Sequence, residues 1–168
     1  VIFYLDETGE HGLIASLQNL SNTYEWGCME EVINISLPTD IGSGYQNTID
    51  LINLGCLTEN GGITAAEAAF EYESRYYSDW YLPSRDELLE LYMSIVGEEN
   101  LLGYADGPVY YWASSLGGFE GYLTNYGNPL DEWTAWSVVF NTPYDWGPGG
   151  SGGSQRSFFN EVLPIRSF

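Results

Sequence analysis

The residues best suited to chemistry in this chain are aromatic and amide side chains in two polar segments, 118–134 and 141–150. Rigid Tyr and Trp rings supply contact area at low entropy cost, and amides supply adaptable hydrogen bonds. The same composition suits sugar binding, in which rings stack on aromatic side chains. The alternative is that these are turn residues with a few aromatics folded back on the core. The candidate ligand-binding residues are Tyr122, Asn125, Tyr126, Asn128, Asp131, Trp133, Tyr144, Asp145 and Trp146.

Acidic side chains in the same segments raise the question of a metal. Calcium takes six to eight oxygen ligands, and the candidate ligands are Asp131, Glu132 and Asp145. The spacing of an EF-hand loop is absent. The sequence therefore leaves open whether Ca²⁺ is bound, and it indicates no other cofactor.

Groups for catalysis are scarce. His11 is the single imidazole, so a Ser/His/Asp triad or a histidine-rich zinc site would have to be built around it. It lies in a predicted turn, where we expect a surface residue. Adjacent carboxylates could serve glycoside hydrolysis, but with 24 acidic residues such pairs arise by chance. We predict no catalytic residues and a protein that is not an enzyme.

The net negative charge excludes several classes of binding partner. The chain has 24 Asp and Glu, four Arg and a net charge of −20. Such a surface repels phosphate backbones, because nucleic-acid affinity depends on Lys and Arg; anionic membranes and sulfated glycans are set aside for the same reason. The acidity favours solubility, including in a salty medium, or a general affinity for cations. No run of 18 apolar residues exists, so no membrane insertion is predicted.

The two cysteines, Cys28 and Cys56, can pair in an exported protein. Closing their loop would then contribute roughly 3 to 4 kcal/mol. They can equally be buried free thiols, because sequence spacing alone does not bring two Cα atoms within reach. The first residue, Val1, already lies in a strand-like run, which we interpret as a mature or excised domain whose signal or upstream modules are not shown.

The elements that must position these residues begin with a predicted β-hairpin, formed by 1–5 and 12–17. From 18 to 60 we expect loops with at most short regular pieces. A length of 168 residues favours one domain with its own core.

A first helix is predicted within 61–77, where Thr64 and Glu67 form a capping box. The residues of its packing face are Ala65, Ala68, Ala69, Tyr72 and Tyr76. A second capping box, Ser84 with Glu87, predicts a helix over 85–96 that ends at Gly97. The residues of its buried stripe are Leu88, Leu91, Tyr92 and Ile95.

The joint before this second helix is unusual. Pro83 forces Leu82 out of the α region, and Arg85 then places a cation near a helix N-terminus, where it is mildly unfavourable. We predict that Arg85 pairs with a nearby carboxylate; the alternative is a solvated side chain.

Strands are predicted at 109–115 and 134–140, the second with Trp136, Val138 and Phe140 on one face. A last strand within 158–168 is interrupted at Pro164, which favours an edge or a bulge. The glycine-rich run 147–154 is predicted to be a mobile loop. Three tryptophans are expected in the core: Trp80, Trp112 and Trp136.

Five segments, in this order and spacing, resemble a known family: IGSGYQNT, TAAEAAFEYESRYYSDWYLPSRDELLELY, YWASS, AWSVVF and the terminal VLPIRSF. The family is named after the C-terminal domain of a Legionella collagen-like adhesin, and the resemblance covers about the whole chain. Its most specific part is Asp-Trp-aromatic-Leu-Pro-Ser followed by Glu-Leu. The chain departs from the family at Leu163, where members commonly carry an arginine, and at Ala69 or Phe70, where a cysteine is frequent.

This family looks like a variant of the C-type-lectin fold, which formylglycine-generating enzymes and retroelement-diversified receptor-binding proteins also use. The resemblance implies a single α+β, C-type-lectin-like domain over 1–168. In it the N-terminal hairpin pairs with the C-terminal strand, two helices pack on a small antiparallel sheet, and the upper half is rich in loops. Some relatives bind glycosaminoglycans, but the basic surface that this requires is absent here.

We therefore expect a non-enzymatic binding or adhesion module, exposed on a bacterial or phage surface, that recognises a glycan or protein through its aromatic segments. One alternative is a structural subunit or decorating domain of an extracellular filament, fibre or phage tail, in which these segments face neighbouring copies. A retroelement-diversified receptor-binding protein is a special case of the first expectation.

Overall fold

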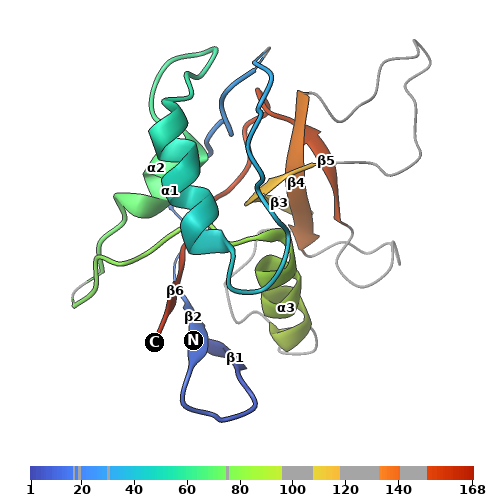
Figure 1. The fold of residues 1–168 in the computed structure, drawn as a ribbon. Helices are drawn as coiled ribbons and strands as arrows, with labels where there is room; N and C mark the ends of the chain where they lie inside the picture. The colour runs from blue at the N-terminus through green and yellow to red at the C-terminus, as the bar shows by residue number, and fades with distance from the viewer. Residues whose placement is uncertain are drawn as a thin grey trace.

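The computed structural model describes residues 1–16, 18, 20–29, 31–74, 76–95, 108–117, 133–140 and 151–168, with the backbone alone for 151 and 152. These residues form a mixed α+β structure with three helices and two small antiparallel sheets (Figure 1). The resemblance implied two helices, a hairpin paired with the C-terminal strand and a small antiparallel sheet, so one helix is additional to that expectation.

The first sheet joins the two ends of the chain. It consists of β1 (Ile2–Leu5), β2 (Gly12–Ala15) and β6 (Ile165–Ser167), with β2 in the middle and antiparallel to both neighbours. The N and C labels lie close together beside this sheet (Figure 1). Pro164 precedes an edge strand, so its missing N–H interrupts no central ladder. The predicted hairpin and its pairing with the terminal strand are confirmed.

The second sheet consists of β3 (Val109–Leu116), β4 (Thr134–Phe140) and β5 (Ser151–Gln155), again antiparallel with β4 in the middle. The two predicted strands are confirmed. The prediction of a mobile loop over 147–154 is wrong for 151–154, which belong to β5, while 147–150 lie outside the described residues. Glycine and serine have low strand propensity, and this strand is specified by pairing along β4 rather than by its own residues.

Helix α1 (Gly44–Leu54) occupies a region predicted to be loops, and that prediction is wrong. The residues on its buried face are Gly44, Asn47, Thr48 and Leu51. Because three of these four are polar or glycine, no apolar stripe marks the helix in the sequence. Ser43 at its start makes no side-chain capping bond, so the usual start signal is absent too. Gly55, with φ +68°, ends the helix in the left-handed region.

Helix α2 (Ala65–Phe70) starts where the sequence predicts, with both halves of the Thr64–Glu67 capping box formed. It ends at Phe70, so Tyr72 and Tyr76, which the prediction placed on its packing face, lie beyond the helix. The chain turns instead, through reciprocal backbone bonds between Ser74 and Tyr77 of 2.9 and 3.2 Å. Its buried surface consists of alanines, which allow α1 to pack closely against it.

Helix α3 (Arg85–Ile95) also starts as predicted. The amide of Ser84 donates to Glu87 Oε2 over 2.7 Å, and the amide of Glu87 donates to Ser84 Oγ over 3.3 Å. Leu88, Leu91 and Ile95 are buried, as expected, whereas Tyr92 is half-buried. The predicted stop at Gly97 lies outside the described residues.

Each face of the sheet β3–β4–β5 packs on a hydrophobic core. The first core contains residues of α3 and the hairpin sheet, and the second core contains residues of α1 and α2. Val138 and Phe140 of β4 point into the first core and Trp136 packs against it, which confirms that these three residues share a face. Trp112 lies in the second core. Trp80 and Trp112 are buried as expected, and Trp136 is half-buried.

The joint at Leu82–Glu87 holds these layers together. Ser114 of β3 donates its amide to Pro83 O over 2.7 Å, and Ser84 Oγ donates to Asp40 O over 2.9 Å. Glu87 Oε1 accepts the amide of Gly42 over 2.9 Å. The Pro83 carbonyl and the Ser84 and Glu87 side chains therefore bind strand β3 and the segment before α1 to the start of α3.

The carboxyl group of Glu87 is fully buried in this joint, and burial raises its pKa above the usual 4.5, although bonds from the Ser84 and Gly42 amides act in the opposite direction. The folded protein holds this proton more tightly than the unfolded chain does. Glu87 therefore contributes stability that is fully present below pH 4.5 and is lost as the pH rises through the raised pKa.

We expect the difference in unfolding free energy between the wild type and Glu87→Gln to shift in favour of the wild type as the pH falls from 7 to 4.5. Urea titrations across this range measure it; a difference that is constant or grows with pH would contradict the assignment.

Candidate functional site

The two aromatic segments leave β4 at opposite ends. Residues 118–132 connect β3 to the start of β4, and residues 141–150 connect the end of β4 to β5. A strand of seven residues separates these two attachment points by roughly 20 Å. The predicted ligand-binding residues therefore form two groups with separate anchors on one strand.

Trp133 is the predicted ligand-binding residue that the structure describes. It lies half-buried at the start of β4. The other predicted residues fall outside the described part of the chain: Tyr122, Asn125, Tyr126, Asn128, Asp131, Tyr144, Asp145 and Trp146. Trp133 thus marks where the first group joins the sheet.

A fully buried arginine, Arg156, lies beside Trp133. Its guanidinium carbon is 5.7 Å from the centroid of the Trp133 ring and 5.7 Å from that of Trp26, within the range of a cation–π interaction. Its amide donates to Trp133 O over 3.1 Å, which extends the β4–β5 pairing by one residue. Arg156 therefore contacts the start of β4 through both its backbone and its side chain.

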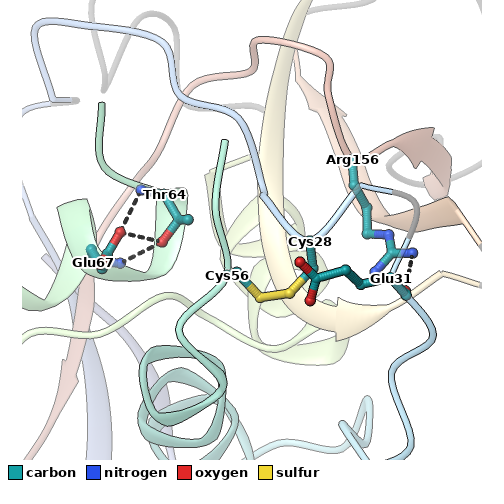
Figure 2. Close-up of a disulfide and its surroundings, with 6 residues drawn as sticks. All are labelled: Cys28, Glu31, Cys56, Thr64, Glu67 and Arg156. Atoms are coloured by element: carbon teal, nitrogen blue, oxygen red, sulfur yellow. Dashed lines mark hydrogen bonds between the residues drawn. A yellow bond between two sulfur atoms is a disulfide. The ribbon is translucent and has the colours of Figure 1, made fainter. Parts of the chain in front are cut away.

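The same arginine reaches the segment that carries the first cysteine. Nη2 of Arg156 donates to Glu31 O over 3.0 Å (Figure 2). Arg156 O accepts the amides of Trp26 and Gly27 over 3.0 and 3.2 Å. Burial lowers the pKa of Arg156, and the carboxylate of Glu31 opposes this shift. An arginine stays charged in proteins, so the interaction places a positive charge inside a strongly acidic molecule.

Cys28 and Cys56 are bonded to each other, with Cα atoms 4.6 Å apart, which decides between the disulfide and the free thiols that the sequence left open (Figure 2). Cys28 has φ +55°, in the left-handed region that residues other than glycine seldom adopt. Its carbonyl accepts the amide of Glu31 over 3.2 Å. The disulfide thus anchors the turn whose last carbonyl receives Arg156.

Sequence reasoning missed Arg156 and Trp26 as parts of this region. Arg156 follows a glycine-rich run that looked like a loop, and Trp26 stands in a stretch without helix or strand period. The one available signal was charge. Arg156 is one of only four positively charged side chains in a chain with 24 acidic ones, which marks it as a candidate for a specific interaction.

The prediction that Arg85 pairs with a carboxylate is confirmed. Its Nε donates to Asp86 Oδ1 over 2.7 Å, and its guanidinium carbon lies 4.9 Å from the Trp136 ring centroid. Arg166 makes a two-pronged contact with Asp79, of 2.8 and 2.7 Å, and lies 4.1 Å from the ring of Tyr77. Both pairs are partly exposed, and their expected contribution is below about 1 kcal/mol each.

Metal ligands are not grouped in the part of the chain that the structure describes. There, no three His, Cys, Asp or Glu residues are grouped so as to hold a metal ion. The calcium candidates Asp131, Glu132 and Asp145 lie outside it. His11 is exposed in the hairpin turn, where the sequence placed it. Among the described helices, none has the length and apolarity to cross a bilayer.

Comparisons with known proteins add no identification. No model of a known protein family matches the chain, and a search of curated proteins finds no significant match in sequence.

Proposed function

We propose that this protein is a non-enzymatic binding module with a C-type-lectin-like fold, exposed on a bacterial or phage surface, that binds a glycan or protein through segments 118–134 and 141–150. The observation that carries the proposal is the attachment of both segments, rich in Tyr, Trp, Asn and Asp, to one strand of a sheet covered on both faces. Loops on a rigid scaffold are the usual place for recognition residues.

The fold assignment in this proposal is supported by the pairing of the N-terminal hairpin with β6, the arrangement that the family resemblance implies. It is also supported by the joint at Leu82–Glu87, where the most specific part of the resemblance is used in packing rather than in chemistry.

Charge restricts the ligand. A net charge of −20 disfavours polyanions through long-range repulsion, which leaves neutral or cationic glycans and proteins. Aromatic rings and amides suit both. Calcium stays part of the proposal as a candidate ion at Asp131, Glu132 and Asp145.

Arrays of neutral, cationic and sulfated oligosaccharides, and of cell-surface proteins, test the proposal when probed with the labelled domain in millimolar Ca²⁺ and again in EDTA. Selective retention by neutral or cationic glycans or by a protein is the expected result. Binding to sulfated glycans alone, or to nothing, would contradict it.

Replacing Trp133, Tyr144 and Trp146 together by Ala is expected to reduce retention to background. Because Trp133 packs on Arg156, the melting midpoint should fall by a few degrees, about what loss of one cation–π contact and some apolar area costs. A matched control replaces three exposed aromatics outside both segments, Tyr45, Phe70 and Tyr77, by Ala. The site is elsewhere if this control, and not the first variant, abolishes retention.

A subunit of a filament or fibre is a second candidate, favoured by the position of β1 at the edge of its sheet among the described residues. This strand lies at the edge of its sheet and carries Ile2 and Leu5, whose side chains are 56% and 52% exposed. An exposed apolar edge is a template for pairing with another chain. Size-exclusion chromatography at high concentration separates the candidates, since a monomer at every concentration argues against assembly.

A further inference from the structure

We propose that Arg156 is the positioning residue of the binding region: it fixes the ring of Trp133, and through it the start of β4, against the disulfide-linked segment. This inference rests on the proposed function for its biological meaning, because Trp133 is the predicted ligand-binding residue that the structure describes.

Three separate contacts converge on Arg156. Its backbone pairs with Trp133 on one side and with Trp26 and Gly27 on the other. Its guanidinium lies 5.7 Å from the rings of both tryptophans. Its Nη2 donates a hydrogen bond to Glu31 O. One side chain thus connects the end of β5, the start of β4 and the segment that the Cys28–Cys56 bond holds in place.

The chemistry of this position requires arginine. A planar guanidinium can lie against aromatic rings and at the same time donate at its rim to a carbonyl oxygen, whereas a lysine ammonium is a compact, strongly hydrated charge. A Lys at position 156 would have to place that hydrated ammonium in a fully buried site. Methionine would preserve apolar volume but would lose both the charge and the donor.

Burial also explains why this residue would act on binding without touching a ligand. Arg156 has no exposed surface, whereas Trp133 is half-buried and keeps part of its surface available. An aromatic side chain whose ring packs against a buried cation is fixed in position before a ligand arrives. Such pre-organisation lowers the entropy cost of binding. Arg156 is therefore assigned a positioning role and Trp133 the contact.

Fluorine NMR of protein labelled with 5-fluorotryptophan tests this assignment without any ligand. The chain has six tryptophans, and the variants Trp133→Phe, Trp26→Phe, Trp80→Phe and Trp112→Phe identify four of the six resonances. In Arg156→Lys we expect both of these resonances to move and that of Trp133 to broaden, while those of Trp80 and Trp112 stay in place. Arg166→Lys is the matched control, because Arg166 also lies over an aromatic ring, Tyr77, but in the other sheet; it should move neither resonance.

Binding is then measured with whichever oligosaccharide or protein the wild type retains on the arrays. We expect Arg156→Lys to weaken that binding about tenfold, in proportion to a buried cation–π contact, and Arg166→Lys to leave it unchanged. A folded Arg156→Lys variant whose Trp133 resonance is unmoved, or which binds as the wild type does, would overturn the inference.

If neither Arg156→Lys nor Arg156→Met folds, wild-type protein labelled with ¹⁵N-arginine decides. Nuclear Overhauser contacts from the Arg156 guanidinium to both indole rings support the assignment, and their absence overturns it. Failure of the arrays alone would count against the proposed function and not against the positioning role, which the NMR result decides.

Discussion

Replacing Gly44 by Ala is expected to lower the free energy of unfolding by about 3 to 5 kcal/mol, the sum of overpacking a tight core and disturbing a buried, hydrogen-bonded carboxylate. A Cβ at this position would collide with the carboxylate of Glu87 and would lie 2.8 Å from the amide of Ser84 and 3.0 Å from Leu82 O. All three neighbours belong to the joint that opens α3. The melting midpoint should fall by about 10 °C.

The matched control for this variant is Gly55→Ala at the other end of the same helix. Gly55 has φ +68° with nothing within 4 Å of an added Cβ, so the substitution carries only the backbone cost of a left-handed residue, about 1 to 2 kcal/mol. Chemical denaturation of both variants measures the difference. If Gly44→Ala is no more destabilising than Gly55→Ala, the close packing of α1 on the joint is wrong.

Reducing the Cys28–Cys56 bond is expected to have the next largest effect. The bond closes a loop with a sequence separation of 28, for which the chain-entropy model gives roughly 3 to 4 kcal/mol. Its loss also frees Cys28 from a left-handed conformation, φ +55°, and so loosens the turn that presents Glu31 O to Arg156. We expect the midpoint to fall by about 10 °C in a dithiol reductant, measured by calorimetry.

The double variant Cys28→Ser with Cys56→Ser is the control for the reductant itself. It should melt where the reduced wild type melts, and the reductant should not change its midpoint further. A wild type that gives two free thiols under denaturing conditions before any reduction, or an unchanged midpoint after reduction, would contradict a structural disulfide.

Elements whose signals are local were predictable from the sequence. The starts of α2 and α3 follow from capping boxes, in which two residues three positions apart satisfy each other's backbone amides. The hairpin, β3 and β4 follow from apolar and aromatic runs between turn residues. The pairing of Arg85 follows from charge, since a cation at a helix N-terminus gains from a neighbouring carboxylate.

Elements specified by tertiary contacts were not predictable. The buried face of α1 contains Gly44, Asn47 and Thr48, which are buried because the joint and β3 offer them partners: Asn47 Nδ2 donates to Ser114 Oγ over 3.2 Å, and Thr48 Oγ1 accepts the amide of Leu82 over 3.0 Å. The strand β5 depends on β4 in the same way. Polar residues in a buried helix face look like a loop until their partners are known.

The candidate site was predictable in composition and not in arrangement. Aromatic and amide content marked segments 118–134 and 141–150, but their attachment at opposite ends of β4 follows only from the strand order. Arg156 could not be recognised, because its neighbours Trp26 and Glu31 lie more than a hundred residues away along the chain.

The central claim is that the joint and the cores maintain the fold while the aromatic segments bind. Isothermal titration calorimetry tests it most directly. The strongest ligand from the arrays is titrated into two variants, Gly55→Ala and the triple Ala variant of Trp133, Tyr144 and Trp146, at a temperature where both are folded. The account predicts wild-type affinity for Gly55→Ala despite its lower melting midpoint, and a loss of at least about a hundredfold, the scale of an interface hot spot, for the triple variant. Wild-type affinity in the triple variant would contradict it.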